Sequence, residues 1–159
     1  KDIPMPFIVQ KEGFIISPYF DYLSFYFNEN WNFPESDIVS LMIKLADSND
    51  GLPLGLKPNK TLSGKDKDQL RDGINLCKEI LVSIGVKKEK IFEGTLNAGH
   101  PGGTLPITEE TVESFHDNRL PRNLYVADAS IFPRSVGKPH IMTISSIAKR
   151  IAKICKEKF

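Results

Sequence analysis

The chain has 159 residues, which is enough to build one core of ordinary size or two small ones. Its 21 basic residues nearly balance its 20 acidic residues, and the net charge is +1. This balance argues against nucleic acid as a main partner, because nucleic-acid binding favours a basic face. No apolar run is long enough to cross a bilayer, so no membrane span is expected.

Strands and an aromatic segment are expected in the amino-terminal part. Residues 5–9 and 13–16 are strand-like, with a turn between them. Residues 19–27 are dense in Phe and Tyr, and packing in a core or on a sheet face is favoured there over the wall of a substrate pocket.

Residues 38–46 are expected to form a further strand. The run also admits a helix, but its β-branched residues and the strong turn at residues 47–51 favour the strand. Residues 52–56 can then return as the partner strand of a hairpin.

Residues 66–84 give the clearest helix prediction. One apolar face is formed by Leu70, Ile74, Cys77, Leu81 and Ile84. Gly85 can end the helix in a left-handed conformation, and Gly73 can allow close packing on a sheet. Residues 90–95 are expected to follow as a short strand.

The carboxy-terminal part is expected to contain two helices around a strand. Residues 108–115 have short-helix character, residues 124–126 form a buried strand, and residues 143–155 form the final helix. The apolar face of that helix comprises Ile144, Ile147, Ala148, Ile151 and Ile154. Its lysines indicate a solvated face rather than a membrane or nucleic-acid patch. Buried free thiols are favoured over a disulfide for Cys77 and Cys155.

Two histidines lie on turns on either side of residues 124–126. His100 stands between Gly99 and Pro101, and His140 follows a second Gly/Pro turn. Asp128 ends the apolar run between them, where open α/β sheets bind ligands. This pattern suggests a site that handles protons beside a cofactor. No histidine has metal-ligand spacing, so no metal is expected.

These residues resemble the carboxy-terminal signature of the glucose–methanol–choline oxidoreductases, flavoenzymes that oxidise alcohols. The family's His-x-x-Gly-Thr element is matched at residues 100–104, and its Asn-Leu-Tyr-Val-Ala-Asp-Ala-Ser-x-Phe-Pro element at residues 123–133. The His140 turn then leads into the last helix. Leu105-Pro106-Ile107 replaces the Cys-Arg-Met-Gly that many members have after the threonine. The family's Gly-x-Gly-x-x-Gly fingerprint is not found in this sequence.

The resemblance implies catalytic roles for both histidines. His100 would be the general base that takes the hydroxyl proton of the substrate, and His140 would orient the substrate oxygen. Without the resemblance, a turn histidine bonded to backbone would be the favoured interpretation of His100. His116 has no motif around it and is expected to be a surface or capping residue.

The resemblance also implies FAD as the cofactor. The backbone N–H groups of Asp128 and Ala129 would bind its ribityl or diphosphate portion, although the Asp128 side chain could equally form an Asx turn. The backbone of Ile141 and Met142 would face the pyrimidine edge of the flavin.

The expected fold class is α+β. Residues 1–95 would form a substrate-binding domain, an antiparallel sheet with helices on one face. Residues 96–159 would supply the last strand and helix of an FAD-binding α/β domain. The amino-terminal FAD-binding portion would be missing, which would expose apolar surface on the final helix and favour dimerisation, aggregation or a partner.

The resulting prediction is the carboxy-terminal fragment of an FAD-dependent oxidoreductase that acts on the CH–OH group of an alcohol or sugar. Alone, the chain is expected to be inactive and to hold FAD weakly or not at all. Two alternatives remain open: a non-catalytic interaction or partner-subunit module that retains the signature, and a substrate-binding domain without redox chemistry.

Overall fold

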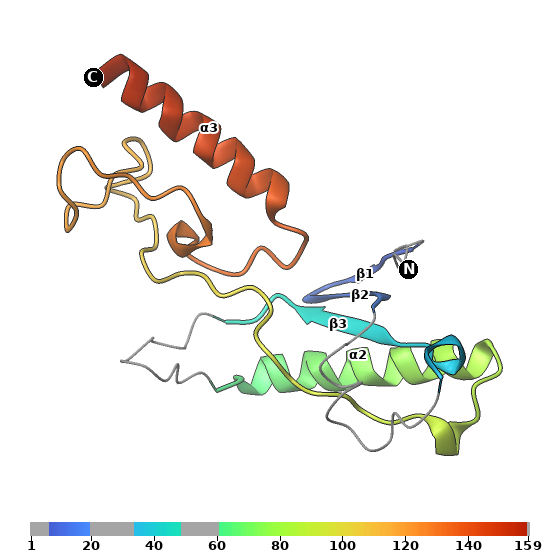
Figure 1. Ribbon diagram of the computed structural model, residues 1–159. Helices are drawn as coiled ribbons and strands as arrows, with labels where there is room; N and C mark the ends of the chain where they lie inside the picture. The colour runs from blue at the N-terminus through green and yellow to red at the C-terminus, as the bar shows by residue number, and fades with distance from the viewer. Residues whose placement is uncertain (1–6, 20–33, 49–60, 159) are drawn as a thin grey trace. The chain divides into compact units, whose positions relative to one another are not determined.

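The computed structural model describes residues 7–19, 34–48 and 61–158. The chain divides into two compact units, residues 1–46 with 64–97 and residues 47–63 with 98–159. The first unit ends at residue 97, and the expected division into residues 1–95 and 96–159 stays a prediction. Figure 1 shows the elements of both units, which are described separately below.

The first unit contains a three-stranded antiparallel sheet in the order β1-β2-β3. The strands are β1 (Val9–Lys11), β2 (Phe14–Pro18) and β3 (Leu41–Leu45), and a short 3-10 helix, η2 (Glu35–Asp37), precedes β3. This confirms the α+β class with an antiparallel sheet, and it confirms the strand interpretation within residues 38–46. The first strand begins at Val9, later than expected.

Helix α2 (Gly64–Ser83) packs on one face of this sheet, against β2 and β3 (Figure 1). The buried core of the unit consists of Phe14 and Ile16 from β2 and Cys77 from α2. Because Ile16 pairs with Val9 on one side and Ile43 on the other, the apolar side chains of all three strands share this face.

Gly73 allows the close packing of α2 on the sheet, as the sequence indicated. A Cβ atom at this position would lie 2.9 Å from Cγ2 of Ile43, closer than real Cβ contacts. Gly85 ends the helix with a φ of 97°. Its N–H donates to the Val82 carbonyl, and the Val86 N–H donates to the Leu81 carbonyl, as in a Schellman motif.

Two expectations for the first unit are wrong. The buried face of α2 is rotated relative to the expected stripe: Leu76 and Ile80 pack against the core, whereas Ile84 lies beyond the helix and is 61% exposed. Residues 91–95 are not a strand, and they follow the short 3-10 helix η3 (Lys88–Lys90). An ion pair of 2.8 Å between Lys78 Nζ and Glu93 Oε1 ties this segment to α2, and none of the three described strands pairs with it.

The second unit contains a 3-10 helix, η4 (Ala129–Ile131), and helix α3 (Ile141–Lys158). The final helix is thus confirmed and is longer than expected. The core of the second unit consists of the buried residues Ile131, Phe132 and Ile151. Ile144, Ile147 and Cys155 also pack against it. These isoleucines are covered within the unit, so the apolar surface expected on the final helix is restricted among its described residues to Ile141 and Met142.

The expected strand at residues 124–126 and the expected helix at residues 108–115 are also wrong. Residues 124–126 are irregular, and the described part of the second unit offers no strand with which they could form a ladder. Residues 109–114 form turns. Thr111 Oγ1 accepts the Thr108 N–H at 2.9 Å, and Phe115 has a φ of 51°, so local side-chain bonding and a left-handed residue replace helix propagation.

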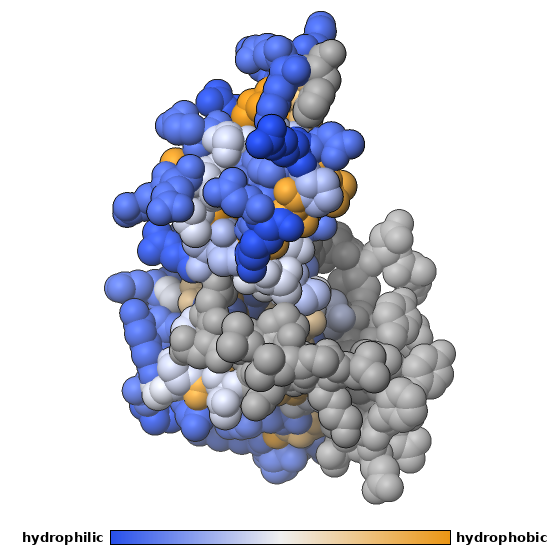
Figure 2. Space-filling view, turned by 90° about the vertical axis from the view of Figure 1, so that its left-hand side faces the viewer, coloured by the Kyte–Doolittle hydropathy of each residue, from blue (hydrophilic) through white to orange (hydrophobic). Residues whose placement is uncertain are grey.

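Expectations about residues 5–6, 20–27 and 52–56 lie outside the described residues. Both cysteines are free thiols, Cys77 buried and Cys155 half-buried. None of the helices in the described ranges has the length and apolar character needed to cross a membrane. The face drawn in Figure 2 is mainly hydrophilic over the described residues, with hydrophobic residues in small separate groups.

Candidate functional site

The imidazole rings of His100 and His140 lie against each other in the second unit. Their centroids are 4.3 Å apart and their planes meet at 80°, an edge-to-face arrangement. His100 is exposed and His140 is half-buried. The structure therefore brings together the two histidines that the sequence singled out, and their catalytic roles stay a prediction.

Two glycines shape the turn that carries His100. A Cβ atom on Gly102 would lie 2.7 Å from the carbonyl oxygen of Ala129, which is backbone and cannot swing away. Gly103 has a φ of 75°, in the left-handed region, and its N–H donates to the same oxygen at 3.0 Å. The glycines of the His-x-x-Gly element thus let this turn approach the start of η4 closely.

The segment after the turn continues along η4 through backbone hydrogen bonds. The Leu105 N–H donates to the Ser130 carbonyl at 2.8 Å, and the Ile107 N–H donates to the Ile131 carbonyl at 2.9 Å. The sequence Leu105-Pro106-Ile107 is compatible with this pairing, because proline, which has no N–H, falls between the two donating residues.

The His140 ring also contacts Phe132, the residue that follows η4. Their centroids are 6.5 Å apart and their planes meet at 85°. Phe132 is 9% exposed and belongs to the core of the unit, which fixes its ring. The His140 carbonyl accepts the Ile144 N–H at 2.9 Å, so this histidine stands at the entry of α3.

The Asp128 side chain caps η4. Its Oδ1 accepts the Ser130 N–H at 2.8 Å, and hydrogen bonding by the side chain and backbone of Ser130 holds the pKa of Asp128 below its usual value. This is the local capping role that the sequence left open for the carboxylate. Within the described residues, the N–H groups of Asp128 and Ala129 donate to no backbone carbonyl outside the regular elements.

Ile141 and Met142 lie in the first turn of α3, directly after His140. Their side chains are 73% and 77% exposed. Helix geometry leaves the first N–H groups of α3 without intrahelical acceptors, and these groups carry the positive end of the helix dipole. The four cofactor-binding residues expected from the sequence therefore flank the two histidine turns.

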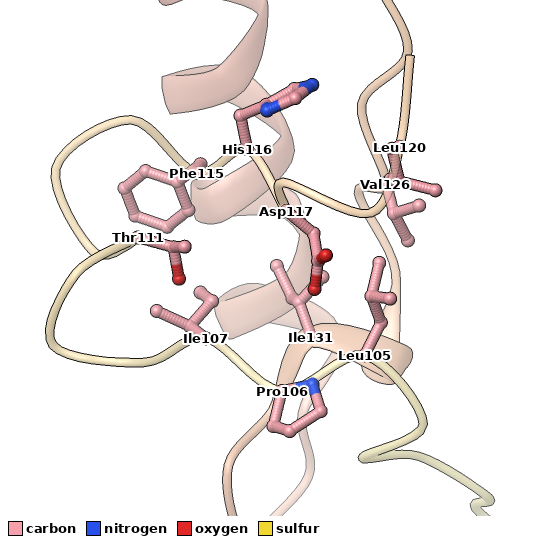
Figure 3. Close-up of a pocket in the computed structure, with 10 residues that line it drawn as sticks. All are labelled: Leu105, Pro106, Ile107, Thr111, Phe115, His116, Asp117, Leu120, Val126 and Ile131. Carbon is pink, nitrogen blue, oxygen red and sulfur yellow. The ribbon is translucent and has the colours of Figure 1, made fainter. Parts of the chain in front are cut away.

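Two hollows of the second unit lie elsewhere. The smaller one, shown in Figure 3, has a volume of about 10 Å³, which is room for about one water molecule. An open hollow of about 450 Å³ is lined by polar residues that include Thr104, Glu110 and Arg119. Neither is lined by His100 or His140, so we place the candidate chemistry at the histidine pair on the basis of its functional groups.

His116 has a structural contact instead. Its Nε2 lies 3.0 Å from the Pro121 carbonyl oxygen, so this nitrogen donates, and its ring lies edge-on to Tyr125 with centroids 5.1 Å apart. Figure 3 shows the ring directed away from the centre of the small hollow, while the Asp117 carboxylate points into it. His116 is half-buried rather than on the surface, and its bond to a backbone carbonyl agrees with the capping alternative.

A pairing that the sequence analysis missed joins Asp117 and Arg119. Arg119 Nε and Nη2 donate to the two carboxylate oxygens at 2.9 and 2.7 Å, and the Arg119 N–H donates to Oδ1 at 2.8 Å. These bonds lower the pKa of Asp117 to about 2. The signal in the sequence was an Asp two residues before a donor, the spacing of an Asx turn.

No metal site was expected. Over residues 7–19, 34–48 and 61–158, no three His, Cys, Asp or Glu side chains gather as a group that could hold a metal ion.

Comparison with known proteins gives one relative to report. The chain is similar to Uncharacterized protein MJ1450 of Methanocaldococcus jannaschii, with 32% identity over 119 residues. The match covers 75% of this chain and 30% of the relative, so the chain spans about 30% of the length of that protein. No family model matches the chain, and no solved structure matches it.

Proposed function

We propose that this chain is the carboxy-terminal part of an FAD-dependent oxidoreductase that acts on the CH–OH group of an alcohol or sugar. The observation that carries the proposal is the contact between His100 and His140, at a centroid distance of 4.3 Å. The sequence separates these rings by a long segment. His100 lies in the His-x-x-Gly-Thr element that resembles the glucose–methanol–choline family, and His140 lies in the turn after the second such element, before the last helix.

In this proposal the two imidazoles have different roles towards the substrate hydroxyl. The exposed ring of His100 accepts the hydroxyl proton, since imidazole is the side chain suited to proton exchange near neutral pH. The half-buried ring of His140 is held by its contacts with His100 and Phe132, and it orients the oxygen. As the proton leaves, the C–H bond breaks and the carbon becomes a carbonyl.

Oxidised flavin, when bound, accepts the hydride released from that carbon. The backbone N–H groups of Asp128, Ala129, Ile141 and Met142 are the donors of this chain that fit the cofactor. Because the Asp128 carboxylate already accepts from Ser130, that residue offers the cofactor its backbone rather than its side chain. The sequence has no Gly-rich diphosphate-binding turn, and we propose that the chain alone retains FAD weakly or not at all.

The test uses the whole protein that carries this sequence. Purified protein should show flavin absorbance, and it should reduce an artificial dye with one of a panel of sugars, polyols, simple alcohols and sterols. His100→Ala should lower kcat by about 10²- to 10⁴-fold with little change in KM, because a general base acts on the transition state.

His116→Ala is the matched control, because His116 belongs to the same unit and donates to a backbone carbonyl outside the histidine pair. It should leave turnover close to that of the wild type. Absence of flavin and of dye reduction, or full activity of His100→Ala, would overturn the proposal and favour a non-catalytic partner module.

A further inference from the structure

One short segment contacts both histidine turns. The η4 turn, defined here as residues 128–132, meets the His100 turn through backbone groups and the His140 ring through a side chain. Both contacts are made within the second unit. The separation of the two imidazoles therefore depends on this segment as well as on their own contact.

The carbonyl oxygen of Ala129 is the atom at which these contacts meet. It accepts the Gly103 N–H at 3.0 Å and the Phe132 N–H at 3.2 Å. The first bond fixes the turn that carries His100. The second bond fixes the residue whose ring lies against His140. A shift of this carbonyl would therefore move both the turn that carries His100 and the Phe132 ring that contacts His140.

Gly102 allows the close approach that the hydrogen bond between Gly103 and Ala129 requires. Its backbone passes so close to Ala129 that a Cβ atom would overlap the carbonyl oxygen at 2.7 Å and approach the Ala129 Cβ at 3.3 Å. Any side chain here forces the His100 turn and the η4 turn apart, because the obstructing atom is backbone. Gly102 is therefore a sensitive position at which to separate the two elements.

Asp128 stabilises the η4 turn from its amino-terminal end. Its carboxylate accepts the Ser130 N–H, and its own carbonyl accepts the Ile131 N–H at 3.4 Å. The carboxylate is thus committed to the turn. Its effect on the histidines passes through Ala129 and Phe132 rather than through direct contact.

We propose that the η4 turn is a positioning element that sets the separation of His100 and His140, and that Asp128, Gly102 and Phe132 are positioning residues acting through it. The importance of this separation for turnover rests on the proposed oxidoreductase function. The geometric part of the proposal can be measured without substrate or cofactor.

The first experiment measures the nuclear Overhauser effect between the ring protons of His100 and His140 in the full chain, labelled for NMR. Rings at 4.3 Å should give a clear cross-peak in the wild type. Gly102→Ala should lose this cross-peak while dispersed amide signals remain. Gly64→Ala is the control, because nothing lies within 4 Å of a Cβ at that position, and it should keep the cross-peak.

A second pair of variants removes the support of His140 without a steric clash. Phe132→Leu should weaken the cross-peak between the histidine rings. Phe14→Leu is matched in residue type and burial, since Phe14 is 6% exposed and Phe132 is 9% exposed, but Phe14 lies in the core of the first unit. It should leave the cross-peak unchanged even if it lowers stability.

The third pair of variants tests Asp128 and distinguishes the hydrogen bond that its side chain makes to the η4 turn from the negative charge of its carboxylate. Asp128→Ala should weaken the cross-peak, whereas Asp128→Asn should restore it, because asparagine caps helices about as well as aspartate. A merely structural residue would not show this rescue in the histidine signal. Persistence of the wild-type cross-peak in Gly102→Ala, Phe132→Leu and Asp128→Ala would overturn the positioning proposal.

Failure of this proposal is distinguishable from failure of the proposed function. In an active whole protein, Asp128→Ala should lower kcat more than it raises KM, and Asp128→Asn should lower kcat less than Asp128→Ala does. If the protein has no oxidoreductase activity, the NMR result still decides the positioning role. If the protein is active and the cross-peak is unaffected by these variants, only the positioning role is refuted.

Discussion

Replacing Gly73 by alanine should destabilise the first unit, although alanine is the better helix former. Gly73 is buried in α2, where the helix crosses β3. A Cβ atom there would lie 2.9 Å from Cγ2 of Ile43, 3.4 Å from its Cδ1 and 3.5 Å from its Cγ1. The substitution therefore sets a gain in helix propensity against a steric overlap.

The magnitudes of these two effects decide the sign. Alanine gains about 1 kcal/mol over glycine in a helix interior. An extra methyl group in a well-packed core costs about 1–3 kcal/mol. The Cγ2 atom of Ile43 is attached directly to its branched Cβ, so it cannot move away without turning the whole side chain. We expect the free energy of unfolding to fall by up to about 2 kcal/mol.

The assay is urea denaturation followed by far-UV circular dichroism, in two backgrounds. In Ile43→Ala, which removes Cγ2, Gly73→Ala should become stabilising by about 1 kcal/mol, because only the propensity gain remains. Gly64→Ala serves as the control, since this glycine starts the same helix with open space around it. It should have the same small effect in both backgrounds.

A stabilising Gly73→Ala in the wild-type background would refute this reasoning. So would an equal loss of stability in both backgrounds, because the overlap with Ile43 would then not be the cause. Either result would mean that α2 and β3 move apart at little cost, and that the close approach at Gly73 does not contribute to packing.

The remaining predictions concern acid stability, thiol reactivity, the second core and surface exposure. Because the folded pKa of Asp117 is about 2 against an ordinary value of 3.8, its contribution to stability is complete above about pH 4 and is lost as the pH falls towards 2; Asp117→Asn should flatten that part of the acid unfolding curve. Burial raises the pKa of Cys77 to about 11, so the free energy of unfolding should fall as the pH rises from 9 through 11. A thiol reagent at pH 8 should label Cys155 before Cys77, which peptide mass spectrometry would detect. Ile151→Ala should cost about 2–5 kcal/mol in chemical denaturation, because the side chain is 4% exposed in the core of the second unit. Met142, 77% exposed, should be oxidised quickly by dilute peroxide in the chain alone and slowly in flavin-loaded whole protein; equal rates would contradict the proposed flavin contact.

Helix periodicity was the most reliable signal in this sequence. It predicted α3 and α2, whose apolar residues recur over several turns. The rotation of the α2 face could not be read from the same pattern, because Gly73 has no side chain and yet marks the line of closest approach to the sheet. A hydrophobicity pattern gives no weight to such a position.

Of the three strands, β1 and β2 were predicted from local signals, and β3 was predicted although its partner β2 is distant in the sequence. β1 and β2 are joined by a tight turn, and both formed close to where alternation and turn residues indicated. Residues 91–95 and 124–126 contain apolar residues but are irregular. A strand is stable only as part of a ladder, so a short apolar run carries little information when its partner is not specified locally.

Some features of the candidate site were predictable from neighbouring residues, and others depend on contacts between distant segments. The glycine and proline residues near His100 and His140 predicted the bends there. The aspartate at position 128 predicted a possible Asx turn, and its side chain does accept the Ser130 N–H. The contact between the two rings depends on how the segments approach in space, and so does the position of Phe132. Only the resemblance to a family suggested that the histidines would meet.

The geometry around Ala129 links the turn that carries His100 to the η4 turn. The His100 turn needs glycine at position 102 because its backbone lies against the Ala129 carbonyl, and the η4 turn, capped by Asp128, supplies that carbonyl. The same oxygen also accepts from Phe132, which contacts His140. Because both turns meet at this oxygen, a substitution at Gly102 should disturb the positions of both histidines, although Gly102 contributes to neither ring contact.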